Sequence, residues 1–395
     1  MKLKRFLALL LTAVMLFSLV ACGGNTDVDE APDVIDSANG SEDDSGGDQN
    51  AEQPDPKELS KTESIEYLKS VEYLDFELLD SAEPYFFGRW FDKEINGEPH
   101  KVTVTDGSAF YFLISNASSF DLDFTVITTM EEPYFAYSID GVEPVRQHIT
   151  ESTVTLPDTE RHTVRIIADG MTEGEGKWKE EKGFAFKGIR VPDGAEIYGI
   201  KPTNKVIFYY GDSITEGIRA LNMNANSDGN SATNSYPWYC SEKLGAVTYS
   251  IGYGASGVTK EGSFNTFIKA IDYNSENREV DDGIKPDLIV INHGTNDTGT
   301  TPRIFKTKLA DAIKRLQEKY EGVKIVYLVP FIQAHADDIA AVVSELDNVY
   351  LVETADWGIS FTDNGYHPDV AGAKKAGEML ADALVEIAGE DFFGN

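Results

Sequence analysis

Ser213 has a residue type and a setting that suit nucleophilic chemistry. It lies in Gly211-Asp212-Ser213, directly after the apolar run KVIFYY at residues 205–210. A serine in a tight turn from a strand to a helix presents its hydroxyl at the sheet edge, where the helix N-terminus favours negative charge. A simple helix cap is the competing interpretation. Thr215 occupies the last glycine position of a G-x-S-x-G elbow, which disfavours an ordinary α/β-hydrolase.

Two later polar residues could serve the same reaction. Asn296 follows the run DLIVIN at 287–292, and a side-chain amide at a strand end can donate a hydrogen bond to an oxyanion. Turn formation is the commoner role of an Asn-Asp pair. His367 precedes Pro368 and a helical stretch, so it could act as general base to a distant serine. Alone, this histidine would more often be a surface or capping residue.

The glycines at residues 252–257 allow two interpretations. Their spacing is literally G-x-G-x-x-G, a dinucleotide-binding motif. That motif follows the opening strand of a βαβ unit and needs an acidic residue at a strand end about 20 positions on. Here it follows the second apolar run, and residues 261–282 do not have a strand pattern. We therefore give NAD binding little weight and interpret Gly257 as a bare backbone N–H that can approach a ligand oxygen.

The elements that must position these residues form two regions with different patterns. After residue 203, apolar runs alternate with helical stretches at 304–320 and 370–388, which predicts a parallel sheet covered by helices on both faces. In such sheets chemistry lies outside the carboxyl ends of the strands. The five predicted strands are 205–210, 246–252, 287–292, 324–330 and 348–353.

Between about residues 66 and 200 the pattern is that of an antiparallel sandwich. Short runs rich in Val, Ile, Phe, Tyr and Thr are separated by Gly, Asp and Pro, and helical periodicity is confined to a short piece near 62–71. The predicted strands are 100–105, 108–115, 121–128, 133–140, 161–168 and 184–191.

Taken in order, GDS, Gly257, the GxND-type turn and the histidine before proline resemble the SGNH (GDSL-like) hydrolase superfamily over about residues 203–390. The resemblance implies a three-layer α/β domain in which Ser213 is the nucleophile and His367 the general base. It further implies an oxyanion hole made by the Ser213 N–H, the Gly257 N–H and the Asn296 amide. No metal or organic cofactor is implied.

One position departs from the family pattern, which is D-x-x-H. The place three residues before His367 holds Asn364, and Asp363 lies one residue further back. Either Asp363 reaches the histidine and completes a triad, or a neutral oxygen orients the ring and the site is a Ser–His dyad. We expect Asp363 to substitute only partly, because a shift of one residue changes the direction of the side chain.

The region upstream of Ser213 resembles the second family of carbohydrate esterases, which pairs a jelly-roll domain with an SGNH domain and removes acetyl groups from sugars. The motifs are Phe87-Gly88-Arg89, Ile139-Asp140-Gly141 and Arg161-His162-Thr163-Val164. An unrelated β-domain is the alternative. Three aromatic residues, Trp238, Trp357 and Tyr366, could stack on a sugar face, although packing in the core is at least as common a role for such residues.

Composition limits the class of partner. The chain has 395 residues and a formal net charge of -33, so nucleic acid is an unfavourable partner. Two cysteines exclude a disulfide scaffold, and six scattered histidines disfavour a zinc cluster. Cys240 is interpreted as a core residue.

The N-terminal residues indicate export and anchoring. Residues 1–22 have a basic start and an apolar run of signal-peptide length, and they end in Leu19-Val20-Ala21-Cys22, which resembles a bacterial lipobox. The resemblance implies lipidation of Cys22 and anchoring at the outer face of the bacterial membrane. An ordinary secretory signal is the alternative. Residues 23–60 hold 12 acidic residues and one lysine, which predicts a disordered tether up to residue 63.

The sequence thus predicts a lipid-anchored serine esterase that acts on acylated carbohydrate, with a sandwich at 64–202 and a hydrolase domain at 203–395. Two alternatives stay open. One is a lipid esterase or lysophospholipase of the same superfamily, and the other is a non-catalytic carbohydrate-binding lipoprotein. The natural sugar and the oligomeric state are not determined by the sequence.

Overall fold

The computed structural model describes residues 56–395, except 128–129, 175, 180–182, 363–364 and 395. The predicted signal peptide, its lipidated Cys22 and most of the acidic tether lie outside this range. Residues 54–395 form one compact unit. Helix α1 (Pro56–Leu68) opens it, a few residues before the helical piece that the sequence predicted. The prediction of a disordered tether up to residue 63 is therefore wrong for residues 56–63, which are helical.

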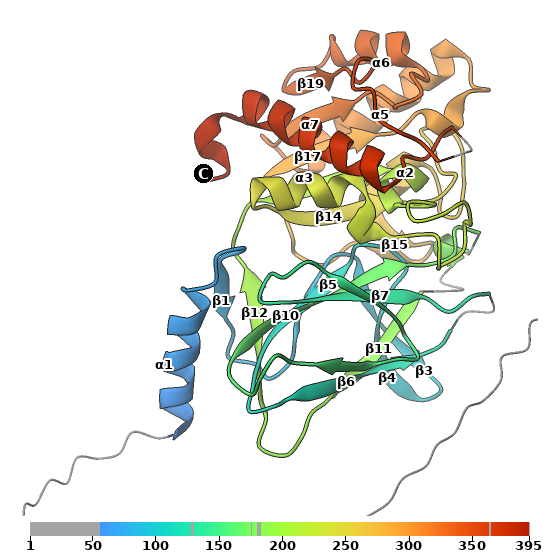
Figure 1. The fold of residues 1–395 in the computed structure, drawn as a ribbon. Helices are drawn as coiled ribbons and strands as arrows, with labels where there is room; N and C mark the ends of the chain where they lie inside the picture. Colours follow the sequence, from blue (N-terminus) through green and yellow to red (C-terminus); the bar gives the residue numbers. More distant parts are fainter. Residues whose placement is uncertain (1–55, 128–129, 175, 180–182, 363–364, 395) are drawn as a thin grey trace, which may run out of the picture. The chain divides into compact units, whose positions relative to one another are not determined.

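An antiparallel sandwich of two sheets follows α1, as predicted (Figure 1, blue to green). The first sheet has the strand order β1-β12-β5-β10-β7-β8, and β2 also pairs with β5. The second has the order β3-β4-β11-β6-β9. All six predicted strands are present. The bounds are β1 (Phe76–Leu78), β2 (Tyr85–Phe87), β3 (Trp90–Ile95), β4 (Glu98–Thr103), β5 (Ala109–Ser115), β6 (Ser119–Thr125), β7 (Tyr134–Ile139), β8 (Val145–His148), β9 (Thr153–Thr155), β10 (His162–Gly170), β11 (Phe184–Arg190) and β12 (Glu196–Pro202).

The apolar sequence of β5 reflects burial on both faces of the first sheet. Phe110 and Phe112 point into the sandwich core, whereas Tyr111 and Leu113 belong to a cluster that also contains the sheet of the hydrolase domain. Every residue of β5 and of β10 is buried. The first sheet is therefore packed between the second sheet and the hydrolase domain.

The hydrolase domain has a parallel sheet of order β14-β13-β17-β18-β19, with the first strand of the domain near the middle. The strands are β13 (Val206–Gly211), β14 (Val247–Gly252), β17 (Leu288–Asn292), β18 (Lys324–Leu328) and β19 (Val349–Val352), and each matches a predicted run. A small antiparallel pair, β15 (Tyr273–Ser275) and β16 (Arg278–Glu279), lies outside this sheet. The helices are α2 (Ser213–Glu216), α3 (Tyr236–Leu244), α4 (Phe267–Asp272), α5 (Pro302–Lys319), α6 (Ala336–Val343) and α7 (Val370–Ala388).

The alternating side chains of β13 separate the two layers of helices. Tyr209 belongs to the cluster that contains α3 and α7, which lie side by side in Figure 1. Phe208 and Tyr210 belong to the cluster that contains α4, α5 and α6. The strand order turns back at β13, and such a switch point opens a crevice at the carboxyl ends of the strands. Ser213 follows β13 and Asn296 follows β17 at this edge.

Candidate active site

A tight turn at the end of β13 presents Ser213. The strand ends at Gly211, and the single turn of α2 begins at Ser213. Asp212 is the N-cap, and its carboxylate accepts a hydrogen bond from the Ile214 N–H at 3.0 Å. A side chain at Gly211 would place Cβ 1.9 Å from the Thr215 hydroxyl oxygen, so the turn closes this tightly only with glycine.

His367 is held between a short bridge and the start of the closing helix. Its carbonyl accepts the Thr362 N–H at 2.8 Å, and Pro368 pairs with Phe361 in an isolated antiparallel bridge. Asp369 then caps α7 by accepting the Gly372 N–H at 2.7 Å. The histidine therefore stands on a backbone that is fixed on both sides.

The structure brings Ser213 and His367 together. The Ser213 Oγ lies 2.8 Å from His367 Nε2, and both residues are buried. Burial lowers the pKa of His367 to about 4, and the charge of Arg219 contributes in the same direction. The imidazole is therefore neutral at neutral pH and can accept the serine proton through Nε2, the arrangement that general-base activation requires. The two residues that the sequence singled out as nucleophile and base thus lie within hydrogen-bonding distance of each other.

Asp363 and Asn364, the two candidate orienters of His367, lie outside the described residues. The choice between a triad and a dyad therefore stays a prediction.

The three predicted donors of the oxyanion hole differ in the hydrogen bonds that they already make. Ser213 is the first residue of α2, so its N–H has no acceptor within the helix. Asn296 uses one amide hydrogen to donate to the Ser256 carbonyl at 3.0 Å, and an amide carries two. The Gly257 N–H instead donates to the Lys260 carbonyl at 2.9 Å. The expectation that this N–H is free thus fails here, because the turn at 257–260 uses it internally.

Asp297 organises the turn that carries Gly257, a role that the sequence did not reveal. Its buried carboxylate accepts the N–H groups of Val258 at 2.9 Å and Thr259 at 2.8 Å. A Cβ at Gly257 would come within 2.4 Å of this carboxylate. Glycine is therefore required at 257 for close approach of Asp297, whatever its N–H does in catalysis.

The three aromatic candidates differ in exposure. Trp238 is buried beneath the Arg165 guanidinium, which lies 4.2 Å from its ring, and Trp357 is buried beside Phe331. Neither can stack on a sugar, so that prediction is wrong for both, and core packing is their role. Tyr366, next to His367, is half exposed, and its stacking role stays a prediction. Cys240 is fully buried, as expected of a core residue.

The sandwich supplies a buried cation to the helix that carries the nucleophile. Lys177, between β10 and β11, forms ion pairs with Glu216 of α2 and, at 3.3 Å, with Asp106. All three side chains are almost fully buried. The sequence offered little signal for this contact, because Lys177 lies in a single 3₁₀ turn outside any motif and its partners are 39 and 71 positions away.

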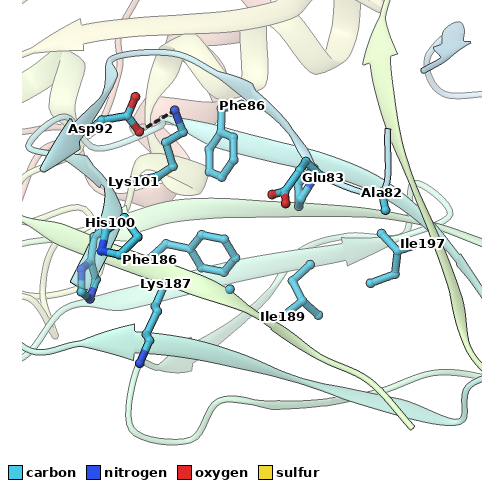
Figure 2. A pocket seen from close by; sticks show the side chains of 13 residues that line it. Ala82, Glu83, Phe86, Asp92, His100, Lys101, Phe186, Lys187, Ile189 and Ile197 are labelled. Carbon is cyan, nitrogen blue, oxygen red and sulfur yellow. Dashed lines mark ion pairs between the residues drawn. The ribbon is translucent and has the colours of Figure 1, made fainter. Parts of the chain in front are cut away.

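A separate pocket of about 420 Å³ opens in the sandwich (Figure 2). Phe86, Phe186 and the ion pair of Lys101 with Asp92 line it, together with His100. Ser213 and His367 are not among its lining residues.

Among the residues that the structure describes, no cluster of three metal-ligating side chains is found, and no helix is long and apolar enough to cross a membrane. The first helix after the glycines at 252–257 begins only at Phe267, unlike a dinucleotide-binding turn.

Comparisons with known proteins agree with this architecture. Residues 209–390 match the model of the GDSL-like Lipase/Acylhydrolase family. A comparison with curated proteins finds no match. A family two carbohydrate esterase from Clostridium thermocellum, solved with cellohexaose, is similar with a TM-score of 0.63 at 18% identity, covering 78% of this chain and 99% of that one.

Two further solved structures share the two-domain fold. The acetyl xylan esterase Est2A from the rumen bacterium Butyrivibrio proteoclasticus matches with a TM-score of 0.62 at 15% identity, covering 80% of this chain and 99% of that one. A salicylyl-acyltransferase from a tetracycline biosynthetic pathway matches with a TM-score of 0.57 at 14% identity, with coverages of 79% and 99%. At such identities the likeness establishes the fold. Residues 209–390 thus form a domain that matches the GDSL-like lipase/acylhydrolase family model, and together with the sandwich they adopt the fold of the family two carbohydrate esterases.

Proposed function

We propose that this protein is a serine esterase that removes acetyl or other small acyl groups from carbohydrate. The observation that carries the proposal is the 2.8 Å contact between Ser213 Oγ and His367 Nε2 at the carboxyl edge of the sheet. The likeness in fold to two carbohydrate esterases, one described as an acetyl xylan esterase, supports the choice of substrate.

The mechanism follows from the positions of these groups. Ser213 Oγ attacks the ester carbonyl while His367 Nε2 accepts its proton. The Ser213 N–H and the Asn296 amide stabilise the oxyanion of the tetrahedral intermediate. The protonated histidine donates to the leaving sugar oxygen, and the acyl-serine that remains is hydrolysed by water with His367 again as base. Asp363, or a neutral oxygen in its place, orients the imidazole, and we expect Asp363→Asn to lose roughly tenfold rather than the ~10⁴ of a full triad member.

A substrate panel tests the proposal. The full chain should release acetate from acetylated polysaccharides and hydrolyse 4-nitrophenyl acetate much faster than 4-nitrophenyl palmitate, and the Ser213→Ala variant should do neither. A preference for palmitate would favour a lipid esterase instead. Binding to polysaccharide without any acetate release would favour a non-catalytic carbohydrate-binding protein.

Acyl transfer is a second candidate, because a salicylyl-acyltransferase shares the fold. An acyl-serine can pass its acyl group to an alcohol as well as to water. Adding a sugar acceptor during turnover of 4-nitrophenyl acetate separates the two. Hydrolysis yields free acetate only, whereas a transferase yields the acetylated sugar.

We also propose that the protein is anchored at the outer face of the membrane through lipidated Cys22. The support is the lipobox-like end of residues 1–22. Cys22→Ala should move the protein from the membrane fraction to the medium or leave an uncleaved precursor. A mature N-terminus elsewhere, or one without lipid, would contradict the anchor.

A further inference from the structure

Arg219 is fixed close to the nucleophile by the backbone that follows α2. The N–H groups of Gly217 and Ile218 both donate to the Ser213 carbonyl, at 3.1 and 2.9 Å. The chain thus folds back onto Ser213 immediately before Arg219. Arg219 itself has a backbone φ of 61°, which is in the left-handed region. Residues other than Gly, Asn and Asp adopt this conformation rarely, because it is strained, and surrounding contacts must then hold it.

Hydrogen bonds from Asn230 enforce this conformation. The Asn230 side-chain oxygen accepts the Arg219 N–H at 2.8 Å, and its amide group donates to the carbonyls of Met171 at 2.7 Å and Ala225 at 3.0 Å. The Asn230 side chain is almost fully buried, and the hydrogen bond to Met171 is shielded from water. The backbone of Arg219 is therefore held in place by the Asn230 side chain.

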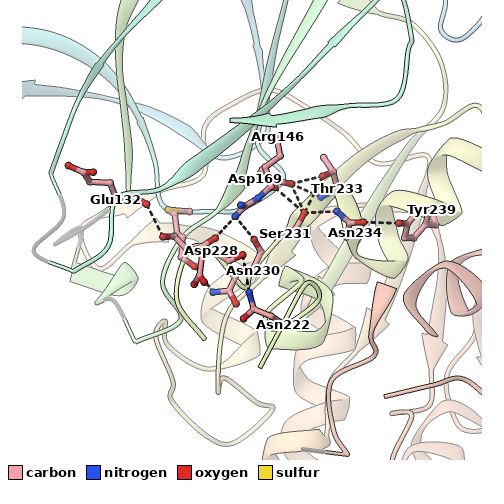
Figure 3. Close-up of polar contacts among 12 residues, drawn as sticks. Glu132, Arg146, Asp169, Asn222, Asp228, Asn230, Ser231, Thr233, Asn234 and Tyr239 are labelled. Carbon is pink, nitrogen blue, oxygen red and sulfur yellow. Dashed lines mark hydrogen bonds and ion pairs between the residues drawn. The ribbon is translucent and has the colours of Figure 1, made fainter. Parts of the chain in front are cut away.

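Asn230 is in turn held by residues of the sandwich, as Figure 3 shows. The Arg146 guanidinium donates to the Asn230 carbonyl at 2.9 Å and to the Ser227 carbonyl. The buried Asp169 pairs with Arg146 at 2.8 Å and accepts the Ser231 hydroxyl at 3.0 Å. The loop that carries the backbone of Arg219 is thus held by contacts from both domains.

The side chain of Arg219 is cationic and incompletely paired. Its Nε is buried, with no hydrogen-bond partner among the residues that the structure describes. Its positive charge lowers the pKa of the His367 imidazole, second to burial, so the guanidinium acts electrostatically on the general base. A cation there opposes the imidazolium that forms when Ser213 attacks, because like charges repel. An anionic ligand would give the Arg219 guanidinium the partner that its Nε lacks among the described residues, and it would offset the repulsion of the imidazolium.

Resting on the proposed esterase function, we infer that Arg219 binds a carboxylate of the substrate, so that the preferred substrates are acylated acidic sugars such as acetylated uronosides. Arginine presents a planar fork of donors that matches a carboxylate. Binding would neutralise the guanidinium and relieve its effect on the imidazolium, so that the charge increases the rate of acylation as well as the affinity. The net charge of the chain repels such a substrate only weakly, since salt screens charges beyond about 8 Å at physiological ionic strength.

A matched pair of substrates tests this inference. One is an O-acetylated methyl glucuronoside, and the other is the same sugar with the carboxylate replaced by a primary amide. The two differ in charge but little in shape. The wild-type chain should prefer the carboxylate by about tenfold or more in kcat/KM, the discrimination expected of a charge-assisted pair of about 1.5 kcal/mol or more. Arg219→Gln should bring the ratio close to one, and Arg219→Lys should retain part of it.

Control measurements separate binding from structural damage. Lys314→Gln removes a cation from the exposed face of α5 and should leave the ratio unchanged. Arg219→Gln should also move the acidic limb of the pH profile upward, because removal of the cation raises the pKa of His367. Loss of structure alone would not produce that shift.

The possible results distinguish the role of Arg219 from the proposed esterase function. Equal rates for the two sugars in the wild type, or an equal loss on both in Arg219→Gln, would overturn the role of Arg219 and leave the esterase proposal intact. Failure to hydrolyse either sugar, with Ser213-dependent hydrolysis of 4-nitrophenyl acetate retained, would instead count against carbohydrate as the substrate class.

Discussion

Ser213 and His367 lie 154 positions apart, yet each is set by its own local device. The carboxylate of Asp212 caps the turn that begins at Ser213, and Asp369 caps the helix that follows His367. Neither side chain has to be ordered at the moment of reaction, because both are buried in the folded chain. At the scale of the residue, the site is therefore pre-organised for proton transfer from Oγ to Nε2.

Removal of either partner should abolish turnover. Ser213→Ala is expected to lower kcat for 4-nitrophenyl acetate by about 10⁴–10⁶, and His367→Ala should be nearly as severe because the two act as one unit. The double variant should be no worse than the single ones. Steady-state kinetics on variants with unchanged circular dichroism would check this, and additive losses would show that the residues act independently.

The low pKa of His367 predicts an unusually broad acidic range. The base works when neutral, so kcat/KM should stay level as pH falls and decline only near pH 4. The pKa in the unfolded chain is near the ordinary value of 6.5, higher than in the folded chain. The neutral histidine therefore stabilises the fold fully above pH 6.5, and this contribution is lost as pH falls towards 4. A pH profile of kcat/KM checks the first point, and a midpoint near 6.5 would contradict it.

At the scale of the elements, the strand ends explain why so much of the site was predictable. Parallel strands read as continuous apolar runs, and chemistry collects at their carboxyl ends. Ser213, Asn296 and His367 follow from that rule together with the resemblance to a known family. The predicted stacking role of Trp238 and Trp357 was wrong because the burial of a side chain depends on what packs over it, which the residue type does not reveal.

Contacts between the domains were not predictable from sequence. Lys177 lies in a single 3₁₀ turn and pairs with Glu216, 39 positions away. Arg219 lies in a turn held by Asn230, which is itself fixed by Arg146 of the sandwich. In the sequence, the only sign of the role of Asp297 is an Asn-Asp turn. No sequence pattern indicates that the Gly257 N–H is used within its own turn. Long-range packing creates these features, and no local pattern encodes them.

The buried pair of Lys177 with Glu216 should matter for the position of α2. Lys177→Met would leave two carboxylates, those of Glu216 and Asp106, buried without their cation, which we expect to cost about 3–5 kcal/mol of unfolding free energy. The double variant Lys177→Met/Glu216→Gln should regain part of this loss. Urea unfolding measures both, with the exposed Lys179→Met as control, and additive effects in the double variant would contradict the pairing.

At the scale of the whole molecule, the two domains share a hydrophobic core. Phe87 and Tyr111 of the sandwich lie in one cluster with Tyr249 of β14, and the Phe87 and Tyr249 rings are 5.6 Å apart. The buried Arg89 of the sandwich donates to the carbonyls of Ala270 and Tyr273 in the hydrolase domain, at 2.8 and 2.7 Å. The sandwich therefore covers apolar surface of the hydrolase domain and forms part of the same core.

A chain cut to residues 203–395 should consequently fail to fold stably. Each large apolar side chain uncovered by the cut loses about 1.5–3 kcal/mol of burial, and several are uncovered together. Residues 54–395 should instead unfold in a single transition, as followed by calorimetry. A soluble, active and cooperatively unfolding 203–395 fragment would contradict the shared core.

The most direct test of the central claim is to trap the acyl-enzyme. The full chain is mixed with 4-nitrophenyl acetate, or with an acetylated xylo-oligosaccharide, quenched in acid within the first turnover, and digested for mass spectrometry. We expect one added acetyl group on the peptide that contains Ser213, absent from Ser213→Ala. An acetyl group on another residue, or wild-type turnover by folded Ser213→Ala, would contradict it.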